Sequence, residues 1–210
     1  MSRNPAGVRG SIFVISAPSG AGKSTLIQRL MAASPDLRFS VSYTTRAPRA
    51  HEKHGRDYFF VSPGIFRRMV RADKFVEWAE VHGHLYGTAE KPLAQAQRIG
   101  RDILLDIDVQ GHQQVRRRLP EAVSVFILPP SFEELARRLR ARHSDAPAEI
   151  ERRLQGAREE IGHWAEYDYL VVNDRLRDAT RALLAIVHAS RFRHACQSAR
   201  VKKIMGKFGG

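Results

Sequence analysis

A glycine-rich turn between a short apolar run and a helical pattern constrains the fold of this chain more than any other feature. It follows the apolar run 12–16 and reads Ala17-Pro18-Ser19-Gly20-Ala21-Gly22-Lys23-Ser24-Thr25. This is the P-loop pattern in its strand–loop–helix setting, except that Ala17 stands where the pattern has glycine. Gly20 and Gly22 let successive backbone N–H groups turn inward around a phosphate. We therefore predict a nucleotide-phosphate site at residues 17–25.

Side chains next to this loop have the chemistry of phosphate and magnesium binding. Lys23 is expected to reach the β- and γ-phosphates, and the Ser24 hydroxyl is expected to bind Mg²⁺ at the positive end of the following helix. A second apolar run, 103–107, leads to Asp106 and Asp108, where a P-loop enzyme carries the acidic residue on the magnesium side. Asp106 is the candidate, partly through water. The alternative is that Asp106 only caps the next helix.

Apolar runs alternate with helical patterns along much of the chain. Strands are predicted at 12–16, 103–107, 123–128 and 169–172, and helices follow them at 24–33, 110–118, 132–142 and roughly 177–194. Short strands that are apolar throughout are typical of parallel sheets buried on both faces. Repeated strand–helix units of this kind predict an α/β fold, a three-layer P-loop NTPase sandwich around a mainly parallel sheet.

Between residues 39 and 88 the pattern changes to a small β-rich insertion. Strands are predicted at 40–44, 58–61, 75–78 and 85–88, with one helix that begins after Ser62 and has Pro63 in its first turn. The remaining segments, 1–38 and 89–210, would form the core. Within it, residues 138–153 would form a mobile lid whose tip is the irregular stretch 143–148.

The charge of the chain indicates anionic partners. Lys and Arg total 35 against 22 Asp and Glu, so the formal net charge is +13. The longest apolar runs, 12–17 and 182–187, are far shorter than the roughly 20 residues that span a bilayer, and the first is too short for a secretory signal. We expect a cytoplasmic protein with no membrane partner. The single cysteine, Cys196, excludes an internal disulfide and a paired-cysteine zinc site.

Several motifs in and around the insertion carry a specific resemblance. They are Ser42-Tyr43-Thr44-Thr45-Arg46-Ala47-Pro48-Arg49, Gly55-Arg56-Asp57-Tyr58, Phe75-Val76-Glu77-Trp78, Tyr86-Gly87-Thr88, Leu105-Asp106-Ile107-Asp108 and Val172-Asn173-Asp174. Together with the P-loop, and in this order, they resemble the guanylate kinase family from about residue 12 to residue 174. The resemblance implies one guanylate-kinase-like domain over about 10–190.

The same resemblance implies an activity and a set of site residues. The activity is Mg²⁺-dependent transfer of the γ-phosphate of ATP to GMP, which gives GDP and ADP. ATP would bind at residues 17–25. The GMP phosphate would be held by Arg46, Arg49, Tyr58 and Tyr86, and the guanine ring by Ser42, Glu77, Thr88 and Asp108. Catalysis would depend on Lys23, Arg46, Arg138, Arg142 and Arg153.

The assignment of Glu77 also rests on the chemistry of guanine. Guanine presents N1–H and N2–H₂ donors beside an O6 acceptor, so a carboxylate facing the donors and a hydroxyl of Ser42 or Thr88 facing O6 complement it. Adenine has an unprotonated N1, which would leave the carboxylate without a partner. The alternatives are ordinary strand packing for Tyr58 and Tyr86, and a surface-strand position for Glu77.

Some choices stay open at the level of sequence. Several arginines of residues 132–158 could form a solvated helix face paired with Glu149, Glu151 and Glu159 instead of a phosphate site. A nucleic-acid binder, suggested by the basic tail 191–207, and a scaffold that has lost catalysis are the other two functional readings. An intact Lys23, Ser24 and Asp106 argue against the scaffold. A homo-oligomer is possible, and neither the oligomeric state nor the structure of the tail follows from the residues.

Overall fold

The computed structural model describes residues 8–81, 83–141 and 147–208, and its central element is a parallel sheet. This sheet has five strands in the order β2-β7-β1-β8-β9, and every neighbouring pair is parallel. Its strands are β1 (Ile12–Ser16), β2 (Arg38–Phe39), β7 (Ile103–Asp106), β8 (Val123–Leu128) and β9 (Tyr169–Val172). The strands predicted at 12–16, 123–128 and 169–172 are confirmed to the residue.

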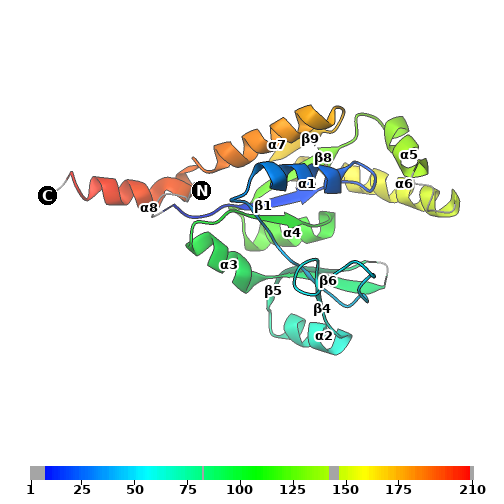
Figure 1. Cartoon of the computed structure of the whole chain (residues 1–210), viewed down its shortest axis with the longest axis horizontal. Coiled ribbons are helices and arrows are strands. Elements are labelled where there is room, and N and C mark those ends of the chain that lie inside the picture. Colours follow the sequence, from blue (N-terminus) through cyan, green and yellow to red (C-terminus); the bar gives the residue numbers. More distant parts are fainter. Residues whose placement is uncertain (1–7, 82, 142–146, 209–210) are drawn as a thin grey trace.

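Helices cover both faces of this sheet (Figure 1). On one face, alternate β1 residues Phe13 and Ile15 pack in a cluster with α1 (Lys23–Ala33) and α7 (Leu176–Ser190). On the other face, Ile12 and Val14 pack with residues of α3 (Glu90–Arg98) and α4 (Val109–Arg118). Because successive side chains of a strand point to opposite faces, the continuous apolar run of β1 serves both clusters. The three-layer α/β fold is therefore confirmed.

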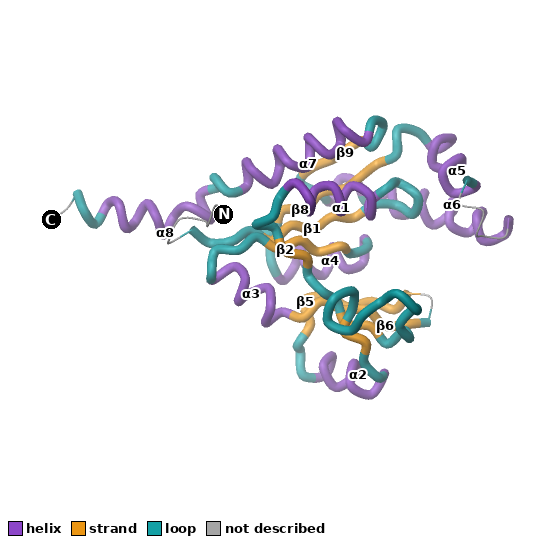
Figure 2. The backbone as a smooth tube through the Cα atoms, in the orientation of Figure 1, coloured by secondary structure: helices purple, strands orange, loops and turns teal. Residues whose placement is uncertain are grey.

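A second, smaller sheet is built from the residues between β2 and α3 (Figure 2). Its order is β4-β3-β6-β5, and its elements are β3 (Tyr43–Thr44), β4 (Phe59–Phe60), α2 (Pro63–Arg71), β5 (Phe75–Val81) and β6 (His84–Ala89). The Ser62 hydroxyl accepts a hydrogen bond from the backbone N–H of Ile65 at 3.3 Å, which confirms the predicted start of α2. β3 and β4 are shorter than predicted, and β5 and β6 are longer.

Two helices extend beyond the carboxyl ends of the core strands, α5 (Phe132–Arg140) and α6 (Pro147–Gly162). They pack against each other through an apolar cluster that includes Leu135, Leu139 and Leu154. The short 3₁₀ helix η1 (Trp164–Glu166) then leads to β9. Arg142 and most of the predicted lid tip, residues 143–146, lie outside the described residues.

The helix predicted at about 177–194 is confirmed up to residue 190 and wrong in its last few residues, because the chain bends there. α7 ends at Ser190 and a separate helix, α8 (His194–Met205), begins four residues later. At the bend, Nε of Arg191 lies 2.7 Å from the buried carboxylate of Asp102, whose other oxygen accepts the backbone N–H of Ser11 at 2.8 Å. This long-range ion pair holds Arg191 at the end of the sheet and directs the chain away from the axis of α7.

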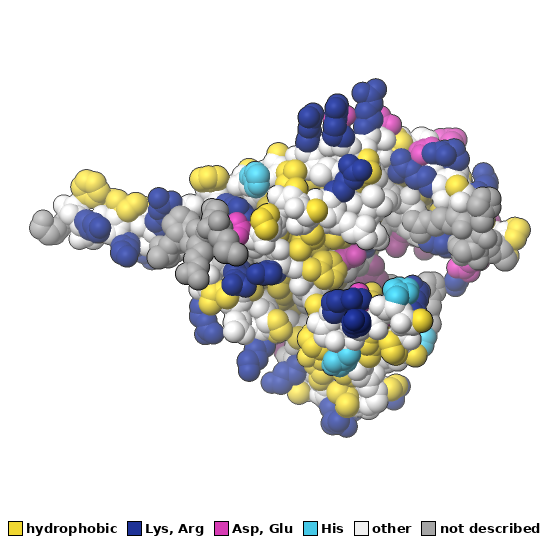
Figure 3. Space-filling view, viewed as in Figure 1, with side chains coloured by type: hydrophobic (Ala, Val, Ile, Leu, Met, Phe, Trp, Pro, Cys, Tyr) yellow, Lys and Arg dark blue, Asp and Glu magenta, His cyan; other side chains and the backbone are white. Residues whose placement is uncertain are grey.

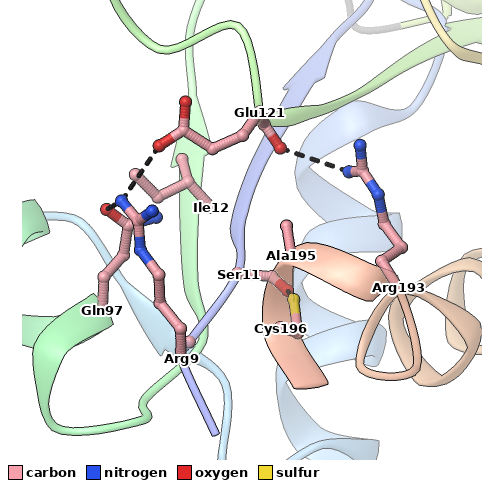
Figure 4. Close-up of a pocket in the computed structure, with 9 residues that line it drawn as sticks. Arg9, Ser11, Ile12, Gln97, Glu121, Arg193, Ala195 and Cys196 are labelled. Carbon is pink, nitrogen blue, oxygen red and sulfur yellow. Dashed lines mark hydrogen bonds and ion pairs between the residues drawn. The ribbon is translucent and has the colours of Figure 1, made fainter. Parts of the chain in front are cut away.

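The first turn of α8 is fixed to the body of the protein by a second group of contacts (Figure 4). The backbone N–H of Arg9 donates to the carbonyl of Cys196 at 3.2 Å, and the side chain of Arg9 reaches Glu121 at 3.0 Å. On the opposite side, Arg193 donates to the backbone carbonyl of Glu121 at 3.2 Å. Cys196 is buried against the hydroxyl of Ser11. Within the described residues, these contacts anchor the start of α8, and residues 199–208 are exposed.

Candidate active site

The P-loop joins the carboxyl end of β1 to the start of α1. Gly20 and Gly22 have φ of 90° and 92°, a left-handed backbone conformation that favours glycine. A Cβ atom at Gly20 would also lie 2.9 Å from the side chain of Leu139 on α5, and one at Gly22 would collide with the amide of Asn173. Both glycines are thus required by backbone shape and by close neighbours.

Asn173 and Arg138 brace this loop from the side of β9 and α5. The buried amide of Asn173 donates to the carbonyl of Ala21 at 2.8 Å. Arg138 donates to the carbonyl of Asn173 at 3.0 Å, and to the carboxylate of Glu134 at 2.7 Å. Hydrogen bonds from Arg137 and Arg138 lower the pKa of Glu134 to about 2, so this partner of Arg138 is ionised at neutral pH.

Lys23 and Asp106 meet at the base of the loop. Nζ of Lys23 lies 2.7 Å from Oδ1 of Asp106 and 3.3 Å from the carbonyl oxygen of Ile107. The helix cap is Asp108, whose carboxylate accepts the N–H of Gly111 at 2.8 Å. The alternative that Asp106 caps α4 is therefore wrong.

The residues proposed for Mg²⁺ have suitable chemistry for that ion. Ser24 is exposed at the start of α1, and Asp106 is only partly buried. Mg²⁺ in phosphate-transfer sites usually takes one or two protein oxygens and completes its shell with water and substrate phosphate. A hydroxyl and a carboxylate next to a phosphate loop fit this requirement. In the part of the chain that the structure describes, no cluster of three or more His, Cys, Asp or Glu forms a metal cage.

α6 contacts the P-loop through Arg153, which the sequence predicted as a site residue, and through Glu160, which it did not. Arg153 lies 3.0 and 2.6 Å from the hydroxyl of Ser19 through two of its nitrogens. Glu160 accepts the backbone N–H of the same serine at 3.3 Å. Burial raises the pKa of Glu160, although that N–H and the nearby Lys23 act in the opposite direction. Glu160 stands seven residues after Arg153, a spacing that places both on one face of α6.

A buried carboxylate lies in the second sheet, at the position expected for a base reader. Glu77 on β5 is only 5% exposed and stands opposite Thr88 of β6 in the strand register. The hydroxyl of Thr88 is 3.3 Å from that of Ser42. The pKa of Glu77 is raised to about 7. Burial is the largest cause and the charge of Asp108 adds to it, while hydrogen bonding from Thr88 acts in the opposite direction. The structure thus brings together all four residues assigned to guanine.

The residues assigned to the GMP phosphate form a neighbouring group. The guanidinium of Arg46 lies 5.6 Å from the ring centre of Tyr58, which in turn makes an edge contact with Tyr86 at 5.9 Å. Arg46 is held by the carboxylate of Glu52 at 2.8 and 3.0 Å, a partner that the sequence did not indicate. Hydrogen bonding to Glu52 raises the pKa of Arg46, and burial raises the pKa of Tyr58. Both groups therefore stay protonated donors at neutral pH.

One residue of the phosphate group lies apart. The backbone N–H of Arg49 donates to Glu52 at 2.8 Å, while its side chain is exposed. No contact between that side chain and Arg46, Tyr58 or Tyr86 is found within the described residues. Arg49 is thus near the phosphate group through its backbone and not through its guanidinium.

Comparison with known proteins decides the family of this site. The guanylate kinase family model matches residues 9–190. Guanylate kinase from Dechloromonas aromatica is 50% identical over 191 residues, which cover 91% of this chain and 95% of that protein. Guanylate kinase from Koribacter versatilis is 53% identical over 189 residues, 89% of this chain and 81% of its own. The crystal structure of guanylate kinase from Anaplasma phagocytophilum has a TM-score of 0.77 and 35% identity, and covers 96% of each chain.

The chain belongs to the guanylate kinase family. The resemblance inferred from the motifs is therefore confirmed over the whole range from the P-loop to Asp174. The roles of individual residues stay predictions. The P-loop follows β1 of the first sheet, whereas Glu77 lies on β5 of the second. Asp108, the N-cap of α4 just after β7, raises the pKa of Glu77 through its charge.

The raised pKa of Glu77 predicts a specific pH dependence of stability. Because the folded protein keeps this proton up to about pH 7, whereas an unfolded carboxyl releases it near the usual 4.5, folding takes up a proton between these values. The contribution of Glu77 to the free energy of unfolding should therefore fall as the pH rises through this window. We expect wild type to lose about 2–3 kcal/mol more than Glu77→Gln between pH 5 and pH 8. Urea unfolding at both pH values measures this difference.

The matched control is Glu80→Gln, which changes an exposed glutamate on the same strand. It should keep the pH slope of wild type. An identical slope in wild type and Glu77→Gln would contradict the assignment of a raised pKa to Glu77.

Proposed function

We propose that this chain carries out the reaction of its family, the transfer of the γ-phosphate of ATP to GMP, with the residues described above. The buried carboxylate of Glu77 beside the hydroxyls of Ser42 and Thr88 is the observation that supports GMP as the acceptor. Within the described residues no ion pair with Glu77 is found, and a buried carboxylate without one is costly, so this position fits a ligand that supplies hydrogen-bond donors.

ATP is proposed to bind at residues 17–25. The inward-facing N–H groups of the loop hold the phosphates, and the ammonium of Lys23 neutralises charge on the transferring group. Asp106 is proposed to orient this ammonium, since the two groups are 2.7 Å apart. Asn173 keeps the loop in shape through its hydrogen bond to Ala21.

GMP is proposed to bind against the second sheet. Glu77 accepts from N1–H and N2–H₂ of guanine, while Ser42 or Thr88 donates to O6 and Asp108 completes the ring site. Arg46, Tyr58 and Tyr86 donate to the phosphate, and Arg49 joins them by turning its exposed side chain inward. Fixing base and phosphate at separate points orients the attacking phosphate oxygen towards ATP.

The helices α5 and α6 are proposed to close over the phosphates. Arg138, Arg142 and Arg153 supply positive charge to the oxygens of the transferring group. Arg138 and Arg153 would exchange partners on closure, from Glu134 and Ser19 to phosphate oxygens. Mg²⁺, held by Ser24 and Asp106 partly through water, would supply further charge neutralisation when bound. The core of 1–38 and 89–210, the GMP-binding insertion of 39–88 and the lid of about 138–153 are proposed as the moving parts.

The first test of this function is ADP formation with ATP, Mg²⁺ and each of GMP, AMP, CMP and UMP. We expect GMP-dependent turnover, and a rate with each of the others that is lower by roughly 10³ or more, because only guanine satisfies Glu77. Comparable rates with AMP would contradict the guanine site. Complete absence of phosphoryl transfer would instead favour a binding role without catalysis.

The second test changes Glu77 to glutamine, which exchanges an acceptor for an amide that can also donate. The kcat/KM for GMP should fall by about 10²–10⁴, or on the order of 3–5 kcal/mol, because a charge-assisted pair in a desolvated site is lost. The rate with AMP should stay level or rise, because the new NH₂ can face adenine N1.

Arg46→Ala is the control for this test, since Arg46 is assigned to the phosphate that all nucleoside monophosphates share. It should reduce the rates with GMP and AMP by similar factors. If Glu77→Gln leaves the GMP/AMP ratio unchanged, the guanine reader lies elsewhere, and Asp108 is the next candidate.

A further inference from the structure

The helix α8 extends away from the body of the protein, at the left of Figure 1. Its first turn is anchored through Cys196, but residues 199–208 are all exposed. Four large apolar side chains are exposed there: Val201 by 49%, Ile204 by 44%, Met205 by 62% and Phe208 by 80%. α8 ends at Met205, and the chain continues in turns, in which the N–H of Phe208 donates to the carbonyl of Met205 at 3.0 Å.

Val201, Ile204 and Met205 lie on one face of α8, and Phe208 follows the helix at the same spacing. Their spacing of three, four and seven residues from Val201 places them in one stripe on a helix of 3.6 residues per turn. On a helix of 3.6 residues per turn, Arg200 and Lys202 lie on the two sides of the stripe and Lys203 lies almost opposite it, while Lys207 follows the end of α8. Figure 3 shows hydrophobic and basic side chains together along this projecting helix.

The charge of this segment has one sign only. No Asp or Glu follows Asp178 in the sequence, so nothing within α8 neutralises its cations. The whole chain adds to the same potential with its net charge of +13. An apolar stripe between rows of Lys and Arg is the pattern of a helix that lies in the interface of an anionic membrane.

We propose that α8 docks on the surface of an anionic lipid bilayer, with its apolar stripe in the acyl boundary and its cations among the headgroups. A second copy of the chain is a poorer occupant, because two such stripes would bring like charges together. Nucleic acid would account for the cations, but it offers nothing to the exposed apolar side chains. The bilayer satisfies both features at once.

This proposal revises the expectation that no membrane is a partner. That expectation rested on the absence of an apolar run long enough to span a bilayer, and among the described helices none is long and apolar enough to cross one. A peripheral helix needs only one apolar face. None of the residues assigned to ATP or GMP lies in α8, so the inference is independent of the proposed catalysis.

Sedimentation with sucrose-loaded vesicles tests the proposal directly. The full chain is mixed with vesicles of phosphatidylglycerol and phosphatidylcholine, and separately with vesicles of phosphatidylcholine alone. We expect binding to the anionic vesicles that weakens with salt, and at least roughly tenfold less binding to the neutral vesicles, since both apolar burial and charge are required.

Two variants with the same change of charge locate the contact. Ile204→Asp places a carboxylate in the apolar stripe and should reduce the partition coefficient at least about tenfold, whereas Ala199→Asp places it on the opposite, exposed face and should reduce it less than about threefold. GMP-dependent turnover of both variants should equal that of wild type.

Three results would overturn the proposal. The first is no sedimentation with anionic vesicles, and the second is an equal loss of binding in the two variants, which would indicate charge attraction alone. The third is a salt-sensitive complex of the protein with duplex DNA that prevents its binding to the vesicles. A concentration-dependent mass that Ile204→Asp abolishes, without any vesicle binding in wild type, would assign the stripe to a second copy.

Discussion

The parallel pairing of β1 with β7 determines where both halves of the site can lie. In this register Ile15 stands beside Asp106, so the loop that leaves β1 begins next to the acidic end of β7. Lys23 and Asp106 then meet at 2.7 Å, and two residues later Asp108 starts α4 and approaches Glu77 of the other sheet. Carboxyl ends of adjacent parallel strands form the usual ligand crevice of such folds. The P-loop and the surroundings of Glu77 are therefore linked through one short segment, 106–108.

The charged groups of the candidate site differ in whether the protein itself supplies a partner for them. Lys23, Arg46, Arg138 and Arg153 each have a polar partner in the protein, which orients their side chains at the proposed phosphate positions. Glu77 differs, because burial raises its pKa and no cation is among the causes that shift it. A carboxylate that burial destabilises and that hydrogen-bond donors of a ligand stabilise discriminates strongly between ligands. In the proposed complex, the N–H donors of guanine would favour this carboxylate, whereas adenine would offer it no donor at N1.

Local patterns predicted the parts of the fold that depend on local chemistry. The P-loop was predictable because its glycines and lysine form a recognisable local motif. The core strands were predictable because burial on both faces requires continuous runs of apolar residues. The two-residue strand β2 was not predicted, and β4 was predicted too long, since two residues show no period. The bend before α8 depends on the ion pair of Arg191 with Asp102, which is far away in the sequence. The contact of Glu160 with Ser19 also joins distant residues, so neither feature leaves a local pattern. The resemblance supplied the roles of Arg46 and Tyr86, which no local pattern implies.

The pKa of the Glu77 carboxyl, measured with and without GMP, tests the central claim most directly. Carbon-13 NMR of the glutamate carboxyl groups provides it, and the resonance that disappears in Glu77→Gln identifies the residue. The account predicts a pKa of about 7 in the free protein and a decrease of two or more pH units with saturating GMP, since guanine N–H donors favour the carboxylate. An unchanged or higher pKa in the presence of GMP would contradict it.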